Sequence, residues 1–142
     1  MLAFAGASIS LAHAAEALVA YRVADGQISA PLTSLPGDPA RGKSAALSRE
    51  GGNCFLCHTF PDAGDTPLGN IGPPLAGVGK RVTAPQLRLR LVDSTRINSL
   101  SVMPAYYRTE GLQRVASTYV GKPLLTAQQV EDVIAYLLTL QD

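Results

Sequence analysis

The sequence is poor in the side chains that build most metal and redox sites. It contains only two cysteines, two histidines and two methionines, and it has no tryptophan. A structural zinc site needs four ligands, whereas Cys54, Cys57 and His58 are the only thiol and imidazole groups that lie together. The scarcity argues against zinc, and it concentrates any cofactor chemistry in one short stretch.

An excess of charge of one sign is also missing. The chain has 12 basic and 11 acidic residues, a formal net charge of +1, so its charge does not indicate a nucleic acid or anionic membrane partner. Its apolar stretches are shorter than the roughly 20 residues that a membrane helix requires. A length of 142 residues with 46% apolar and 16% charged residues is typical of one soluble globular domain.

The first 14 residues, "MLAFAGASISLAHA", differ from the rest because they carry no charged side chain. The small residues Ala12 and Ala14 flank His13, a pattern typical of signal-peptidase cleavage after Ala14. We expect a signal peptide or its remnant at residues 1–14 and export to the periplasm. The positively charged start of a signal peptide is missing, so either the true start lies upstream or the signal is atypical. The alternative is a buried apolar helix.

Proline and glycine divide the next part of the chain into an arm, a helix and a loop. Residues 15–37 are interrupted by both residue types, which predicts an extended arm with a brief strand. Asp38 is a good N-cap, and a helix is expected from Pro39 until Gly51 and Gly52 stop it. Residues 59–80 show no sustained period and are expected to form a long loop.

Two more helices are expected towards the C-terminus. Thr83 caps the first, in residues 83–94, and an irregular stretch over 93–125 follows. Thr126 caps the last helix, where Gln129 completes a capping box. Its apolar stripe follows a helical period and consists of Val130, Val133, Ile134, Leu137 and Leu138. The small residues Gly42 and Ala46 on the first helix would allow Tyr136 or Leu137 to approach closely.

The stretch "NCFLCH", residues 53–58, contains both cysteines. Two cysteines two residues apart with histidine directly after them match the attachment site of c-type haem. The thiols of Cys54 and Cys57 add across the haem vinyl groups, and His58 becomes the proximal iron ligand. The alternatives are a thioredoxin-like redox pair, a zinc site and a structural disulfide. A thioredoxin-like pair is expected next to a βαβ unit, for which the sequence gives no sign.

Elimination indicates a second iron ligand. Removal of residues 1–14 would take away Met1 and His13, so Met103 would be the only methionine left. Methionine with histidine is a common ligand pair of electron-carrying haem. Met103 can instead fill a gap in the core, and lysine or an open position on the iron are further alternatives.

Several motifs carry a resemblance to a known family. "GDPARGK", "NCFLCH", "IGPPLAG", "MPAYY" and "LTAQQVEDVIAYLLTL" are similar to class I cytochromes c, and the run from "VADGQISAPLTSLPGDPARG" onward resembles, more narrowly, the SoxX family. The resemblance implies an all-α, class I cytochrome c fold with few helices around one covalent haem. It also implies an extended N-terminal arm at 15–37 and a cytochrome c domain at 38–142.

The resemblance implies a role for each residue of the haem site. Cys54 and Cys57 would form the thioethers to haem c, His58 would be the proximal ligand of the iron, and Met103 would be the distal ligand. The carbonyl group of Pro73, in "GPPL", would accept the ring N–H of His58, in agreement with the rule that a second-shell acceptor orients a ligand histidine.

The resemblance also implies a function and partners. The SoxAX cytochrome joins thiosulfate oxidatively to a cysteine of the carrier protein SoxYZ, an L-cysteine S-thiosulfotransferase reaction, with the substrate chemistry at a cysteine-ligated haem of SoxA. The SoxX haem accepts electrons for a downstream cytochrome. The present chain has no third cysteine, so it would be a non-catalytic, electron-transfer subunit. The alternative is a free-standing periplasmic electron carrier. Tyr106 and Tyr107, close to Met103, are expected to contribute to the partner interface, and the alternative is that both rings pack inside the domain.

Overall fold

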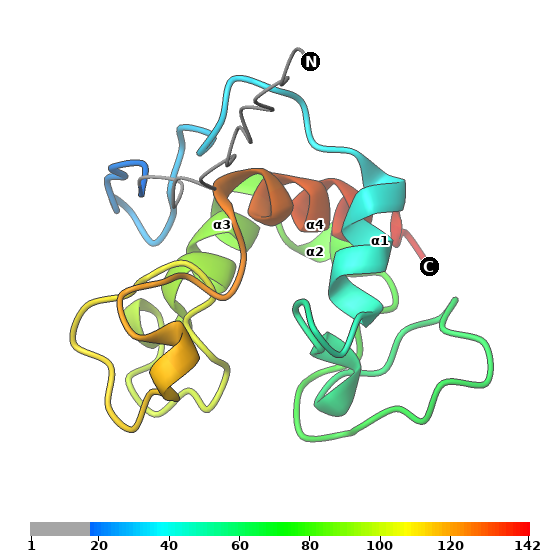
Figure 1. Ribbon diagram of the computed structural model, residues 1–142. Coiled ribbons are helices and arrows are strands. Elements are labelled where there is room, and N and C mark those ends of the chain that lie inside the picture. Colours follow the sequence, from blue (N-terminus) through cyan, green and yellow to red (C-terminus); the bar gives the residue numbers. More distant parts are fainter. Residues whose placement is uncertain (1–17) are drawn as a thin grey trace, which may run out of the picture.

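The computed structural model describes residues 18–142 (Figure 1), so the predicted signal peptide at 1–14, with Met1 and His13, lies outside the described residues. The helices are α1 (Pro39–Leu47), α2 (Val78–Arg81), α3 (Ala84–Asp93) and α4 (Ala127–Thr139), with short 3₁₀ helices at Cys54–Leu56, Ser94–Arg96 and Ser117–Tyr119. None of the helices in this part of the chain is both long and apolar enough to span a membrane.

The arm before α1 contains no strand in the part that the structure describes. The brief strand expected at 15–37 is wrong, because the only pairing there is an isolated bridge between Ala24 and Gln27. The arm packs through Ile28, whose amide donates to the Pro85 carbonyl at 3.1 Å, and through Leu32. Apolar burial thus ties the arm to the helices.

Helices α3 and α4 begin where the sequence predicts. Thr83 and Thr126 each form a capping box with the glutamine three residues later, which satisfies amide groups that a helix start leaves unpaired. Helix α1 begins at Pro39 as expected, with Asp38 accepting the Arg41 amide. It ends at Leu47, so its predicted continuation to Gly51 is wrong. Ser48 adopts an extended conformation at its C-terminus.

Helix α2 was not expected, since residues 59–80 were predicted to be loop throughout. The helix contains only four residues, Val78–Arg81. It is stabilised by contacts with the C-terminus of the chain, where the Gly79 amide donates to the Leu140 carbonyl at 2.9 Å. A propensity argument could not identify it, because a helix this short depends on tertiary contacts.

The crossing of α1 and α4 confirms the expected role of Gly42. A methyl group at Gly42 would overlap the Asp132 carbonyl oxygen and would lie 2.9 Å from Cβ of Tyr136. Only glycine permits this approach of the two backbones. Ala46, one turn later, is fully buried. The crossing therefore depends on small side chains on α1, and Tyr136 is the residue that approaches.

Two irregular segments extend from the same side of the helices (Figure 1). The haem-attachment segment, residues 48–77, lies below α1 and contains the "NCFLCH" motif. The Met103 segment, residues 94–126, lies below α3. The helices thus bring together two stretches that are distant in the sequence, and these stretches carry all the predicted site residues.

Candidate haem site

The attachment turn places both cysteines on one tight bend. Asn53 has a left-handed backbone with φ of 49°, and the 3₁₀ helix Cys54–Leu56 follows it. The amides of Cys57 and His58 both donate to the Cys54 carbonyl, at 3.2 and 3.0 Å. A methyl group at Gly52 would lie 3.0 Å from the Cys54 sulfur. The turn is therefore compact, and the two thiols and the imidazole leave it within five residues.

The alternatives to haem attachment find little support in this geometry. Cys54 and Cys57 are not joined by a disulfide. Burial raises the pKa of the Cys54 thiol to about 11, although contact with Tyr106 lowers it, whereas a thioredoxin-like pair needs a thiol with a lowered pKa. Within residues 18–142 no cluster of three or more acidic, thiol or imidazole groups could bind a metal ion. A structural zinc site would therefore lack the ligands that it needs.

His58 is oriented by the loop that follows it. Its Nδ1 lies 2.7 Å from the Pro73 carbonyl oxygen, and a carbonyl can only accept, so the ring proton resides on Nδ1. Nε2 then keeps its lone pair for a metal. Gly72 lies against the ring, since a methyl group there would overlap the imidazole. The glycine was not identified from the sequence, although "IGPP" marks a tight turn at that position.

Backbone hydrogen bonds connect this loop to the attachment turn. The Gly69 amide donates to the Phe55 carbonyl at 2.7 Å, and the Gly72 amide donates to the Cys57 carbonyl at 2.7 Å. A methyl group at Gly69 would overlap the Leu56 carbonyl oxygen. Gly69 is required because the two backbones are in direct contact there, and Gly72 is required because it lies against the His58 ring. Pro73 is thus placed next to His58 by the glycines that precede it.

Met103 lies in the second segment, half-buried against the core. Two serines fix its backbone: Ser94 Oγ donates to the Met103 carbonyl at 3.1 Å, and the Met103 amide donates to Ser101 Oγ at 3.3 Å. The two hydroxyls also contact each other at 2.9 Å. Neither serine was expected at the site from the sequence. Ser94 and Ser101 are seven residues apart, and only the fold of the loop between them brings their hydroxyl groups together, so the sequence gave no sign of this contact.

The interface role expected of Tyr106 and Tyr107 is wrong for the protein described here. The two side chains are only 6% and 2% exposed. Tyr106 donates its hydroxyl to the Gly52 carbonyl at 2.8 Å, and the Tyr107 hydroxyl accepts the Val19 amide at 2.8 Å. Both rings therefore pack inside the domain, with the hydroxyl groups satisfied by partners that are distant in the sequence.

The residues on the two segments fit a large apolar cofactor. Both segments carry exposed apolar side chains, namely Leu56, Ile71, Ile97, Leu100 and Val102, of which Leu100 and Val102 are 85% and 80% exposed. Exposed apolar groups in this number indicate a binding surface. Beside Cys54, the buried Oδ1 atom of Asn53 has no hydrogen-bond partner. The donor set of two thiols, an imidazole and a thioether is that of c-type haem.

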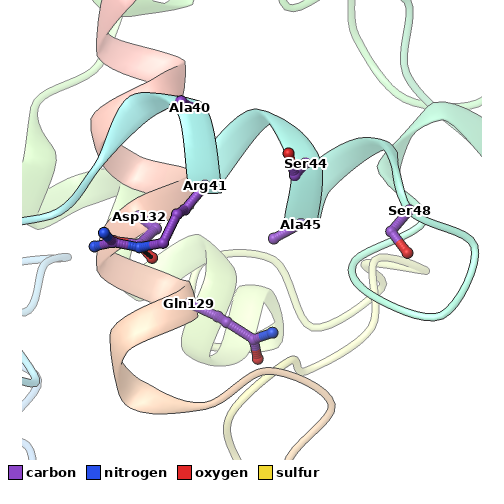
Figure 2. Close-up of a pocket in the computed structure, with 7 residues that line it drawn as sticks. All are labelled: Ala40, Arg41, Ser44, Ala45, Ser48, Gln129 and Asp132. Carbon is purple, nitrogen blue, oxygen red and sulfur yellow. Dashed lines mark hydrogen bonds and ion pairs between the residues drawn. The ribbon is translucent and has the colours of Figure 1, made fainter.

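A hollow between α1 and α4 is separate from this site (Figure 2). Arg41 and Asp132 form an ion pair across it, with Nε 2.8 Å from Oδ2. Its lining contains none of the predicted haem residues and consists of Ala40, Arg41, Ser44, Ala45, Ser48, Gln129 and Asp132. The hollow belongs to the helix crossing, and the haem chemistry lies in the two segments.

Comparison with known proteins identifies the family. The cytochrome c family model matches residues 39–141. A chain in the crystal structure of SoxXA from P. pantotrophus is 35% identical, with a TM-score of 0.79, and the match covers 86% of the present chain and 95% of that chain. No curated protein sequence matches. The chain belongs to the cytochrome c family, which confirms the all-α cytochrome c fold and the haem c cofactor.

Proposed function

We propose that this cytochrome c is the monohaem electron-transfer subunit of a periplasmic, thiosulfate-oxidising complex of the SoxAX type. The observation that carries the proposal is the likeness to a chain of SoxXA over 86% of the present sequence, together with a single haem-attachment motif. The family model covers residues 39–141, and we propose that residues 15–37 form an addition to a cytochrome c domain at 38–142.

Each site residue has a separate task in this proposal. Cys54 and Cys57 would hold the cofactor by thioether bonds, His58 would bind the iron through Nε2, and Met103 would supply a thioether sulfur as the second ligand. The bound haem supplies an iron centre that exchanges one electron. The hydrogen bond from His58 Nδ1 to the Pro73 carbonyl, 2.7 Å long, fixes the ring and increases its basicity as a ligand.

The proposal assigns the sulfur chemistry to a partner. A thiosulfate-conjugating centre needs a cysteine or a second haem, and this chain has no cysteine beyond Cys54 and Cys57. We therefore assign that step to a SoxA-type subunit that acts on a cysteine of SoxYZ, while this chain passes the electrons to a downstream cytochrome. Residues 1–14 would direct the chain to the periplasm as a signal peptide.

The test is reduction of the haem by thiosulfate. Purified holoprotein alone should stay oxidised, because it has no site that binds and oxidises the substrate. Addition of a SoxA-type subunit and its SoxYZ carrier should produce the ferrous absorption spectrum. Rapid reduction by thiosulfate without any partner would contradict the subunit role. Purification of the native protein without a second haem subunit would favour a free-standing electron carrier.

A further inference from the structure

We propose that Tyr106 is a positioning residue that couples the Met103 segment to the haem-attachment turn. The side chain would keep the distal methionine at the correct distance from the iron bound through His58. The inference rests on the proposed ligand role of Met103 and adds to it a residue that touches neither the iron nor the substrate.

The inference rests on a buried hydrogen bond between the two segments. The Tyr106 hydroxyl donates to the Gly52 carbonyl at 2.8 Å across 54 residues of sequence. Gly52 is buried and lies two residues before Cys54. Tyr106 thus contacts the attachment turn at the point where the first thioether would form.

No other hydrogen bond or ion pair within residues 18–142 joins the haem-attachment segment, 48–77, to the Met103 segment, 94–126. The other polar contacts of the two segments are made within each segment, with the arm or with the helices, as when Asp62 binds Lys43 of α1 and Tyr136 of α4. A buried hydrogen bond is directional and its loss leaves a carbonyl unsatisfied. It can therefore fix the distance between the two segments more strictly than apolar contacts alone.

The backbone of Tyr106 is itself fixed, so its side chain holds the attachment turn at a set position relative to Met103. Its amide donates to the Leu91 carbonyl in α3 at 3.0 Å, and its carbonyl accepts the Leu125 amide at 2.9 Å. Met103 lies only three residues away, and Pro104 between them restricts the backbone. The tyrosine therefore links α3, the end of the Met103 segment at Leu125 and the attachment turn at a point close to the methionine.

Tyr107 offers a matched control next to Tyr106. It is equally buried, and its hydroxyl also forms a hydrogen bond of 2.8 Å, but its partner is the Val19 amide in the arm. Replacement of either residue by phenylalanine keeps the ring and removes one hydrogen bond, which is buried for Tyr106 and partly buried for Tyr107. A general loss of stability should be similar in both variants, whereas a change at the iron should be specific to Tyr106.

The experiment measures how readily imidazole displaces the methionine from ferric holoprotein. We expect Tyr106→Phe to bind imidazole about tenfold more tightly, because the lost hydrogen bond lets the Met103 segment move away. The weak near-infrared band of methionine ligation should also diminish. Tyr107→Phe should bind imidazole within about twofold of the parent, since a bond of the same kind is lost away from the site. Chemical denaturation of both variants measures the shared loss of stability.

Equal imidazole affinities in the two variants would overturn the inference. So would a Tyr106→Phe chain that attaches no haem while Tyr107→Phe does, because the hydroxyl would then act in attachment and not in placement of the methionine. The absence of the near-infrared band from the parent protein would instead contradict the proposed ligand role of Met103. Different measurements would therefore contradict the positioning role of Tyr106 and the ligand role of Met103.

Discussion

The helical framework and the two segments below it are stabilised by different means. Among the helices, Gly42 permits direct backbone contact and the bidentate ion pair of Arg88 with Glu131 is almost fully buried. The segments instead depend on turn hydrogen bonds and expose Leu100 and Val102 almost completely. The framework should therefore set the stability of the fold, whereas order in the segments should depend on the bound haem, since a ligand stabilises the state that binds it.

Loss of the attachment site gives the largest expected effect in the segments. In the double variant Cys54→Ser, Cys57→Ser no thioether can form, because a hydroxyl does not replace the thiol in addition to a vinyl group. Acid–acetone extraction should move essentially all of the pigment into the organic phase, whereas the parent should keep its red colour in the protein pellet. Pigment retained by the double variant would show that the haem is held by other bonds.

Loss of the Arg88 side chain gives the largest expected effect in the framework. Arg88 donates to both oxygens of Glu131 at 2.7 and 2.8 Å and also to the Ile28 carbonyl, while the Leu32 amide donates to Glu131 at 2.8 Å. Arg88→Met should reduce the free energy of unfolding by about 3–5 kcal/mol, because it leaves a buried carboxylate without its partner cation. Chemical denaturation provides the measurement, and limited proteolysis should show a loosened arm.

A control on the same helix tests this explanation. Arg90 forms no ion pair within the described part of the chain and donates only to the Gln86 carbonyl. Arg90→Met should therefore change stability by less than about 1 kcal/mol. The double variant Arg88→Met, Glu131→Leu should recover much of the loss. Equal losses in the two single variants would show that the buried pair has no special role.

Overpacking of the helix crossing should have a somewhat smaller effect. Gly42→Val places a branched side chain where even a methyl group would overlap the Asp132 carbonyl, and overpacking costs about 3 kcal/mol or less in most cores. Ala40→Val, at an exposed residue of α1, should cost less than about 1 kcal/mol. Denaturation of the two holoproteins would measure the difference. Similar stabilities would contradict close contact between α1 and α4.

The difference between the two regions also explains what the sequence could predict. The boundaries of α3 and α4 followed from local signals, because a threonine cap and a glutamine three residues later specify a helix start. The haem motif was equally local. Gly42 was identified as a contact point because small residues lie on one face of α1 and an apolar stripe with a helical period lies on α4. These features depend on residues that are close in sequence or repeat with a helical period.

Features that depend on distant partners were not predicted. Helix α2 forms against the C-terminus through the hydrogen bond from Gly79 to Leu140. Tyr106 and Tyr107 are buried because Gly52 and Val19 supply partners for their hydroxyl groups. An exposed tyrosine and a buried, satisfied tyrosine have the same local sequence pattern. The position of such a side chain is decided by tertiary contacts, for which one sequence without a structure gives no signal.

Loss of the methionine should separate ligation from attachment within the Met103 segment. Met103→Ala should keep the covalent haem but remove the near-infrared band, and the reduction potential should fall because methionine ligation favours ferrous iron. The half-buried side chain should contribute only about 1 kcal/mol to stability. A variant whose near-infrared spectrum equals that of the parent would show that Met103 only packs against the core.

The smallest expected effect is a pH dependence in the framework, from Asp132. Its side chain is only 3% exposed, and burial alone would raise its pKa. Hydrogen bonds from Arg41, Gln128 and the Asp38 amide outweigh burial and hold the pKa below its ordinary value of 3.8. The contribution of this carboxylate to stability is therefore complete above that value and is lost as the pH falls through the lower pKa of the folded protein.

Replacement of the partner cation tests that dependence. Arg41→Gln removes the hydrogen bonds at 2.8 and 2.9 Å to Asp132 and should reduce the stability at pH 7 by about 1 kcal/mol, because Arg41 is largely exposed and water screens the pair. The difference between variant and parent should shrink below about pH 4, as Asp132 becomes protonated in both. The control is Lys80→Gln, because the ion pair of Lys80 with Asp142 is exposed. This variant should show the same dependence of stability on pH in acid as the parent.

A constant difference between Arg41→Gln and the parent down to pH 2 would show that Arg41 stabilises the crossing of α1 and α4 by packing and not through the ionised carboxylate.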